Sequence, residues 1–389
     1  MSMNFVYLFN ILSKIIHQNM CRHISAILLA AFALMGCLSC QKGEPRHAIN
    51  FYHWKSSYQV DEEVRTYTKG LGCEKIYLHY FDVVKKDGLV FPVNFIKPIE
   101  QNLLRQDSVR IIPVIFIANE VFADTDMGEY AIQSLVDKIY AMINTIALHV
   151  GGPLYCSVGN MEEKKCEWSP LFNLPDPVDD PDSPHYREIQ FDCDWTQTTK
   201  ENYFTFLSFM KKTLPGVKIT STIRLHQVKD RETMGVPPAD KGYLMCYATS
   251  GVDDGSDSNS ILDVNLLKNY TQKLNRYPLP LDYALPIFSW GIVSNQNGKV
   301  KLVNGLTNSD MDETRFRKIG ENKYEVLEDC FLNGLYINEG FTIEIEEITP
   351  PLLRSAIQYL DEKIKKDYTI VYFHLSKGFL KRYSIDDLK

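Results

Sequence analysis

Two acidic residues that stand two positions apart are the side chains of this chain best suited to chemistry. In the segment 189–195, Asp192 and Asp194 alternate with apolar residues. Side chains of a strand point alternately to its two faces, so the two carboxyl groups share one face at a separation of about 6–7 Å. Burial and mutual repulsion raise the pKa of one member of such a pair, which suits general acid–base catalysis. Asp192 lies deeper in the strand and could equally hydrogen-bond to neighbouring strands, whereas Asp194 lies nearer the strand end.

The same segment resembles the strand-four motif of family-18, chitinase-like glycoside hydrolases, which reads Asp-x-x-Asp-x-Asp-x-Glu. Asp192 and Asp194 match the second and third aspartates. Ile189 stands in the place of the first aspartate, and Thr196 stands in the place of the glutamate. In that family the glutamate is the catalytic acid, and the preceding aspartate assists the N-acetyl group of the substrate. The resemblance therefore implies a carbohydrate site in which the proton donor is missing.

The order of three short motifs also resembles that of a poorly characterised group of bacterial barrel proteins related to glycoside hydrolases. The motifs are Tyr52-His53-Trp54, Gln190-x-Asp192-x-Asp194 and Ala284-Leu285-Pro286-Ile287-Phe288-Ser289-Trp290. This resemblance spans most of residues 48–375 and implies a carbohydrate-active architecture without naming a reaction. An unidentified carbohydrate is therefore the expected partner, and no cofactor is expected.

Polar and aromatic side chains near the ends of other expected strands are candidates to accompany the two aspartates. Glu120 is the best second carboxylate, because glycosidases normally flank the scissile bond with two of them; its alternative role is a charge at a helix N-terminus. Trp54 and Trp290 could stack on sugar rings or belong to the core. Arg224 could pair with one of the aspartates across adjacent strands and keep it ionised. The other candidates for substrate binding are Asn119, Asp82, His226, Tyr247 and His374.

Eight apolar runs of strand length alternate with helical segments along the chain. Most are rich in β-branched or aromatic residues, as strands are. Strands that alternate with helices indicate a parallel sheet, and eight such units favour closure into a barrel. The sequence therefore predicts an α/β fold, a single (β/α)8 TIM barrel over residues 48–389. The expected strands are 48–54, 75–82, 109–117, 188–194, 218–224, 242–247, 282–290 and 368–374.

Two of the helices carry start signals in the sequence. Thr198 and Glu201 have the spacing of a capping box ahead of an amphipathic segment. Thr349-Pro350 has the pattern of an N-cap followed by proline in the first helical turn, and it is expected to open the last helix.

Two insertions interrupt the alternation of strands and helices. The first, at about 150–186, is rich in proline and acidic residues, and its Cys156 and Cys166 could form a disulfide in an oxidising compartment. The second, at about 291–348, is expected to be rich in β-structure, because it contains a turn signal at 295–298 and an alternating pattern at 343–346.

The beginning of the chain resembles a bacterial lipoprotein signal. The apolar run 24–34 is too short to span a bilayer comfortably, although a transmembrane anchor is the alternative. Leu34-Met35-Gly36-Cys37 is similar to a lipobox, with Cys40 as a second and weaker candidate. We therefore expect residues 1–36 to be a signal peptide and 37–47 to hold the lipidated Cys37 and a linker. The expected location is the bacterial cell envelope, the outer membrane in particular, with attachment through the lipid anchor only.

Composition narrows the possible partners and leaves three functions open. A formal net charge of −7 without a basic stretch argues against nucleic acid and against electrostatic attachment to anionic lipid. The cysteines and histidines do not cluster with the spacing of a zinc site, so no metal is expected. The three functions are a carbohydrate-cleaving enzyme, a non-catalytic glycan-binding barrel, and a scaffold for a surface complex. A second carboxylate about 5–10 Å from Asp194 across the mouth would favour the enzyme.

Overall fold

The computed structural model describes residues 47–389 except 59, 98–108, 125–126, 150–186 and 253–258. His47–Lys389 form one compact unit. The expected signal peptide, the lipidated Cys37 and the insertion at about 150–186 with its two cysteines lie outside the described residues. Among the residues that are described, no helix is long and apolar enough to cross a membrane.

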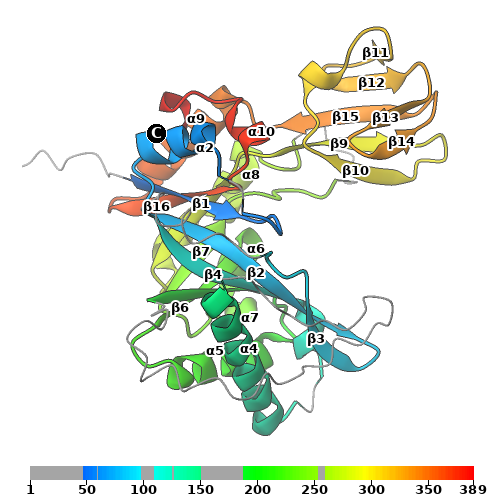
Figure 1. Cartoon of the computed structure of the whole chain (residues 1–389). Helices are drawn as coiled ribbons and strands as arrows, with labels where there is room; N and C mark the ends of the chain where they lie inside the picture. Colours follow the sequence, from blue (N-terminus) through cyan, green and yellow to red (C-terminus); the bar gives the residue numbers. More distant parts are fainter. Residues whose placement is uncertain (1–46, 59, 98–108, 125–126, 150–186, 253–258) are drawn as a thin grey trace, which may run out of the picture. The chain divides into compact units, whose positions relative to one another are not determined.

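Eight parallel strands close into a barrel, as the sequence predicts (Figure 1). Each strand pairs with the next along the chain, and the last strand closes the barrel against the first. All eight expected strands are present, so the prediction of a (β/α)8 barrel is confirmed. The strands are β1 (His47–His53), β2 (Lys75–Lys86), β4 (Arg110–Ile117), β5 (Glu188–Asp192), β6 (Lys218–Arg224), β7 (Lys241–Met245), β8 (Leu281–Pro286) and β16 (Tyr368–Phe373).

Helices connect the strands, and their apolar faces pack on the outer face of the barrel. The last long helix begins as expected, because the Thr349 side chain accepts a hydrogen bond from the Leu352 amide and Pro350 opens the first turn. The capping box expected at Thr198 is wrong, since Thr199 is the N-cap of α5 and the Thr198 hydroxyl pairs with Thr196. The described helices include α2 (Glu62–Gly70), α4 (Glu129–His149), α5 (Lys200–Thr213), α6 (Leu225–Lys229), α7 (Arg231–Met234), α8 (Val264–Tyr270), α9 (Pro350–Lys363) and α10 (Lys377–Leu380).

Strand β2 runs beyond the barrel and folds back into a hairpin that the sequence did not reveal. It pairs antiparallel with β3 (Leu89–Val93) through a turn at Asp87-Gly88, both with positive φ. The pairing of β2 with β4 shifts by one residue between His79 and Phe81, which is the mark of a β-bulge. The bulge decides which side chains of the second half of β2 point into the barrel.

The insertion at 291–348 forms a sheet of its own, in agreement with the expected β-structure (Figure 1). Five antiparallel strands lie in the order β10-β9-β15-β12-β11, and β13 and β14 form a separate hairpin. The expected turn at 295–298 joins β9 to β10, with Gly298 at a φ of 72°. The strands are β9 (Ser289–Ser294), β10 (Val300–Asn304), β11 (Phe316–Lys318), β12 (Lys323–Val326), β13 (Cys330–Leu332), β14 (Leu335–Ile337) and β15 (Thr342–Glu347).

The expected strand 282–290 proves to be two strands, which corrects the position of Trp290. The barrel strand ends at Pro286, a residue without an amide hydrogen, and β9 of the insertion begins at Ser289. Trp290 therefore belongs to the insertion sheet and does not end the seventh barrel strand. Its indole N–H donates to Glu346, which also accepts hydrogen bonds from the amide and hydroxyl of Ser260.

The interior of the barrel is aromatic, and its outer face is apolar. Phe191 and Cys193 of the β5 segment pack outward into the main core, as the alternation predicts. Inside the barrel, Tyr52, Tyr77 and Tyr243 belong to a separate cluster of buried side chains. Polar residues of β5 therefore face an interior lined by tyrosines.

Candidate functional site

A cavity of about 180 Å³ opens at the carboxyl ends of β4 to β7. Barrel enzymes place their active sites at this end of the strands. Five residues chosen from the sequence meet in the cavity: Asp192, Asp194, Arg224, His226 and Tyr247. The remaining lining residues are Phe116, Leu225, Met245, Ala248 and Tyr270.

Asp192 is the buried acid of the cavity. It is 9% exposed, and its Oδ1 accepts a hydrogen bond of 2.6 Å from the hydroxyl of Thr222 on β6. Burial raises the pKa of Asp192 to about 7, and the hydrogen bond from Thr222 opposes that rise. The charge of Asp194 adds to the rise, whereas Arg224 counteracts it. Asp192 is therefore partly protonated near neutral pH.

Asp194 is the solvent-facing acid and forms an ion pair with Arg224. The Arg224 guanidinium lies 3.0 Å from Oδ2 of Asp194, which is the cross-strand pairing expected from the sequence. The turn after β6 is fixed by Gln227, which accepts from the Arg224 amide and donates to the Trp195 carbonyl. Both partners of the pair are about two-fifths exposed, with 39% for Arg224 and 43% for Asp194, so a ligand can reach them.

His226 and Tyr247 line the cavity with surface that is partly apolar and partly polar. Burial lowers the pKa of the half-buried His226, so its imidazole is neutral at physiological pH. Burial raises the pKa of Tyr247 well above its ordinary value, so its hydroxyl stays protonated. The Tyr247 ring contacts Phe373 at 5.7 Å and Phe288 at 6.2 Å between centroids. His226 and Tyr247 thus supply neutral hydrogen-bonding groups on an apolar surface.

The structure does not bring the expected second carboxylate to the cavity. Glu120 is exposed on the short helix η1 (Asn119–Phe122), and Asn119 accepts a hydrogen bond of 2.6 Å from Thr199. The described carboxylates that line the cavity are Asp192 and Asp194, which come from one strand segment. Thr196 is exposed, and its hydroxyl pairs with those of Thr198 and Thr199 at 3.0 and 3.2 Å.

The other sequence candidates lie beside the cavity or away from it. Trp54 is half-buried and packs on the aromatic cluster inside the barrel, 5.6 Å from Phe373. Asp82 does not line the cavity and accepts a hydrogen bond from His79. His374 packs against Phe379, and burial lowers its pKa to about 4. Neither His374 nor Trp290 lines the cavity.

Three residues of this region escaped the sequence reasoning. Thr222 shares a strand face with Arg224, so strict alternation along β6 could have identified it as a partner of Asp192. His79 could not be assigned, because the bulge in β2 disturbs the alternation. Phe373 carries no polar signal, although it joins Trp54 to Tyr247.

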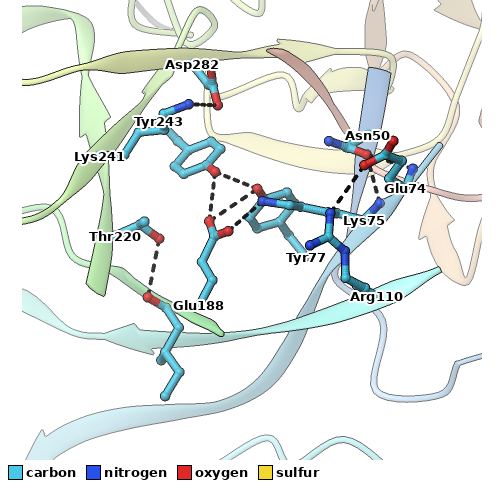
Figure 2. A network of polar contacts seen from close by, with 11 residues as sticks. Asn50, Glu74, Lys75, Tyr77, Arg110, Glu188, Thr220, Lys241, Tyr243 and Asp282 are labelled. Atoms are coloured by element: carbon cyan, nitrogen blue, oxygen red, sulfur yellow. Dashed lines mark hydrogen bonds and ion pairs between the residues drawn. The ribbon is translucent and has the colours of Figure 1, made fainter. Parts of the chain in front are cut away.

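The opposite end of the barrel holds a closed polar network (Figure 2). Glu188 at the start of β5 accepts hydrogen bonds from Lys75 at 2.6 Å, Tyr243 at 2.8 Å and Tyr77 at 3.3 Å. The hydroxyls of the two tyrosines lie 2.5 Å apart. Figure 2 shows the side chains of Lys75 and Tyr77 from β2 and of Tyr243 from β7 converging on the carboxylate of Glu188. This arrangement locks the strands together and leaves Glu188 only 4% exposed.

Comparison with known proteins identifies the fold. No family model and no curated protein matches the chain. Among solved structures, the spore cortex-lytic enzyme SleL of Bacillus cereus matches with a TM-score of 0.50 and 15% identity, covering 89% of this chain and 75% of that one. A chitinase from Chromobacterium violaceum has a TM-score of 0.49 and 9% identity, with coverages of 88% and 99%. A class V chitinase from Nicotiana tobaccum has a TM-score of 0.46 and 10% identity, with coverages of 88% and 97%. The chain thus shares the barrel fold of SleL.

Proposed function

We propose that the barrel binds a carbohydrate at its mouth and does not hydrolyse it. The resemblance of the segment 189–196 to the strand-four motif of family-18 glycoside hydrolases supports a carbohydrate ligand. The barrel fold that the chain shares with SleL, a cortex-lytic enzyme, agrees with it. The observation that carries the proposal is the lack of the family's glutamate at the cavity, because the exposed Thr196 stands in its place. Asp192 and Asp194 both come from the end of β5, and each already has a partner, Thr222 and Arg224 respectively.

Hydrolysis of a glycosidic bond needs a proton donor, and most glycosidases add a second carboxylate on the opposite side of the bond. In family-18 enzymes the N-acetyl group of the substrate takes that second role, so the proton donor is the group that decides. Within the described part of the chain, the cavity has carboxylates on one side only. The position of the family's glutamate holds Thr196, which is exposed and does not line the cavity. The aliphatic hydroxyl of threonine cannot replace a carboxylic acid as a proton donor, because its pKa is far too high.

The charges of the cavity indicate which sugars it accepts. Arg224 neutralises Asp194, and Asp192 is partly protonated. The net charge of these three side chains therefore lies between zero and slightly negative. Tyr247 and Tyr270 offer aromatic surface and hydroxyl groups. The ligand is therefore a neutral or amino sugar, because a uronate would bring a second negative charge beside Asp192.

Calorimetric titration of the purified full-length protein with neutral, amino-sugar and uronate oligosaccharides tests this proposal. We expect saturable binding of a neutral or amino-sugar oligomer, no product by mass spectrometry after long incubation, and loss of binding in Asp194→Ala. Asp124→Asn is the matched control, since this exposed carboxylate pairs with Lys85 outside the cavity. Product formation by the wild type that disappears in Asp194→Asn would refute the non-catalytic assignment.

Hydrolysis with Asp192 as the proton donor is the second candidate, favoured by the pKa of about 7. A carboxyl group with such a pKa is protonated often enough at neutral pH to act as a general acid. Turnover that falls above pH 7 and is lost in Asp192→Asn would select this candidate. Binding without turnover at every pH would eliminate it.

We also infer that the chain is exported and anchored by a lipid on Cys37. This inference rests on the lipobox and on the short apolar run before it. Labelled palmitate should be incorporated into the chain in a bacterial host. Incorporation should disappear in Cys37→Ser and persist in Cys40→Ser. The reverse result would assign the lipid to Cys40. A wild-type chain that incorporates no palmitate would contradict the lipid anchor.

A further inference from the structure

The indole of Trp54, which follows β1, packs against the imidazole of His79, and that imidazole is hydrogen-bonded to Asp82. Its ring centroid is 4.7 Å from that of His79, with the two planes inclined by 32°. His79 is 4% exposed, whereas Trp54 is half-buried. On its other sides the indole meets Tyr52 at 6.2 Å and Phe373 at 5.6 Å. One aromatic residue at the mouth is therefore both accessible and fixed by its neighbours.

Two further side chains orient the imidazole. The Nε2–H group of His79 donates to Oδ1 of Asp82 at 2.6 Å, because a carboxylate can only accept. The second oxygen of Asp82 accepts from the side-chain amide of Asn94 at 2.5 Å. Asn94 follows β3 and has a φ of 54°, a conformation that asparagine tolerates better than most residues. The chain His79–Asp82–Asn94 thus runs from the mouth to the returning strand of the hairpin.

The bulge in β2 makes this chain of contacts possible. Residues three positions apart in a regular strand point to opposite faces. The register shift between His79 and Phe81 adds one residue, so Asp82 shares the face of His79. Bulges commonly re-aim a side chain in this way next to functional sites. Without it, Asp82 would point to the helices and the imidazole would lose its partner.

His79 also connects the indole to the buried acid of the cavity. It is among the groups whose charge acts on Asp192, on the neighbouring inner surface of the barrel. The aromatic contacts lead from Trp54 through Phe373 to Tyr247, which lines the cavity. Trp54 is therefore continuous with the cavity wall although it does not line the cavity itself.

We propose that His79, Asp82 and Asn94 are positioning residues that hold the indole of Trp54 as a flat platform for a sugar ring. This inference rests on the proposed glycan binding and adds the site of the second ring, beside the ring held in the cavity. The platform recognises the apolar face of an uncharged pyranose. Fixing the indole before binding reduces the entropy lost when the sugar stacks on it.

We call the contacts from Asn94 through Asp82 and His79 to Trp54 the relay. Fluorine NMR of the full-length protein labelled with 5-fluorotryptophan tests the relay independently of glycan binding. The chain has four tryptophans, and Trp54→Phe assigns the resonance of interest. Asp82→Asn removes one acceptor while keeping the size of the side chain, so it preserves the fold better than a change at the buried His79. We expect this resonance to shift and broaden in Asp82→Asn. Asp124→Asn is the matched control, because it breaks the ion pair of Lys85 on the same strand, and it should leave the resonance unchanged.

Affinity for the glycan that the wild type binds completes the test. We expect the Kd to rise about tenfold in Asp82→Asn and at least as much in Trp54→Ala, with no change in Asp124→Asn. An unmoved resonance in Asp82→Asn would overturn the relay. A moved resonance with an unchanged Kd would overturn the platform. If the wild type binds no glycan, the proposed function fails, and the platform fails with it. A resonance that moves in Asp82→Asn would still support the relay in that case.

Discussion

The two ends of β5 bury the same kind of group in opposite ways. Glu188 at the amino end accepts from a lysine and two tyrosines and is sealed within a network. Asp192, four residues further along the same inward face, has one donor, Thr222, and borders a cavity. A buried carboxylate with several donors stabilises the fold, because these donors replace the water molecules that it loses on burial. A carboxylate with free acceptor capacity beside a cavity is available to a ligand. The amino end of β5 therefore stabilises the barrel, and its carboxyl end is available to recognise a ligand.

The largest expected effect concerns the amino end. Glu188→Ala leaves Lys75 and two buried tyrosine hydroxyls without their acceptor, so we expect the free energy of unfolding to fall by about 3–5 kcal/mol. Urea denaturation followed by circular dichroism measures it. Glu188→Gln, which retains an acceptor, should lose less. A loss below about 1 kcal/mol in Glu188→Ala would break the distinction between the two ends.

Asp192 should make the free energy of unfolding depend on pH. Its pKa is about 7 in the folded chain against an ordinary value of 3.8, so the folded state holds the proton more tightly. That contribution to stability is fully present below about pH 4 and is lost as the pH rises through 7. The total is about 4 kcal/mol as an upper bound. The amide of Asp192→Asn does not titrate.

We therefore expect the stability of Asp192→Asn relative to the wild type to increase between pH 4 and pH 8. Urea denaturation at several pH values gives the difference between the two proteins, in which the other titrating groups largely cancel. A difference that stays constant over this range would mean that Asp192 is ionised in the folded chain with an ordinary pKa.

The smallest expected effect is that of restoring the family's glutamate. Thr196 is exposed and bonds to Thr198 and Thr199, so its side chain points away from the cavity. We expect no turnover of any glycan by Thr196→Glu and no change in affinity beyond about twofold. Mass spectrometry of the products decides. Appearance of product would show that a single residue separates this mouth from a catalytic one.

The barrel could be predicted from sequence because its strands are short apolar runs separated by helix signals. The error at 282–290 has a physical cause, since the apolar run continues through Pro286 while the backbone leaves the barrel. The hairpin with β3 was missed because Leu89–Val93 is too short to stand out. A capping pattern also allows more than one start, and here Thr199 rather than Thr198 is the N-cap.

The candidate site could be predicted where it depends on strand ends alone. Asp192, Asp194 and Arg224 follow from the alternation of β5 and β6, and the structure brings them together. Glu120 failed to join them because its direction is set by the short helix after β4, which strand periodicity does not describe. His79 depends on a bulge, and a bulge changes the facing of every later residue in the strand.

Closure of the barrel depends on its last strand. Strand β1 pairs with β16, so closure of the barrel joins its first and its last strand. Until Tyr368–Phe373 is available, β1 and β8 keep unpaired edges. A chain that lacks this strand can form only an open sheet. We therefore expect a product truncated before Tyr368 to associate through those edges.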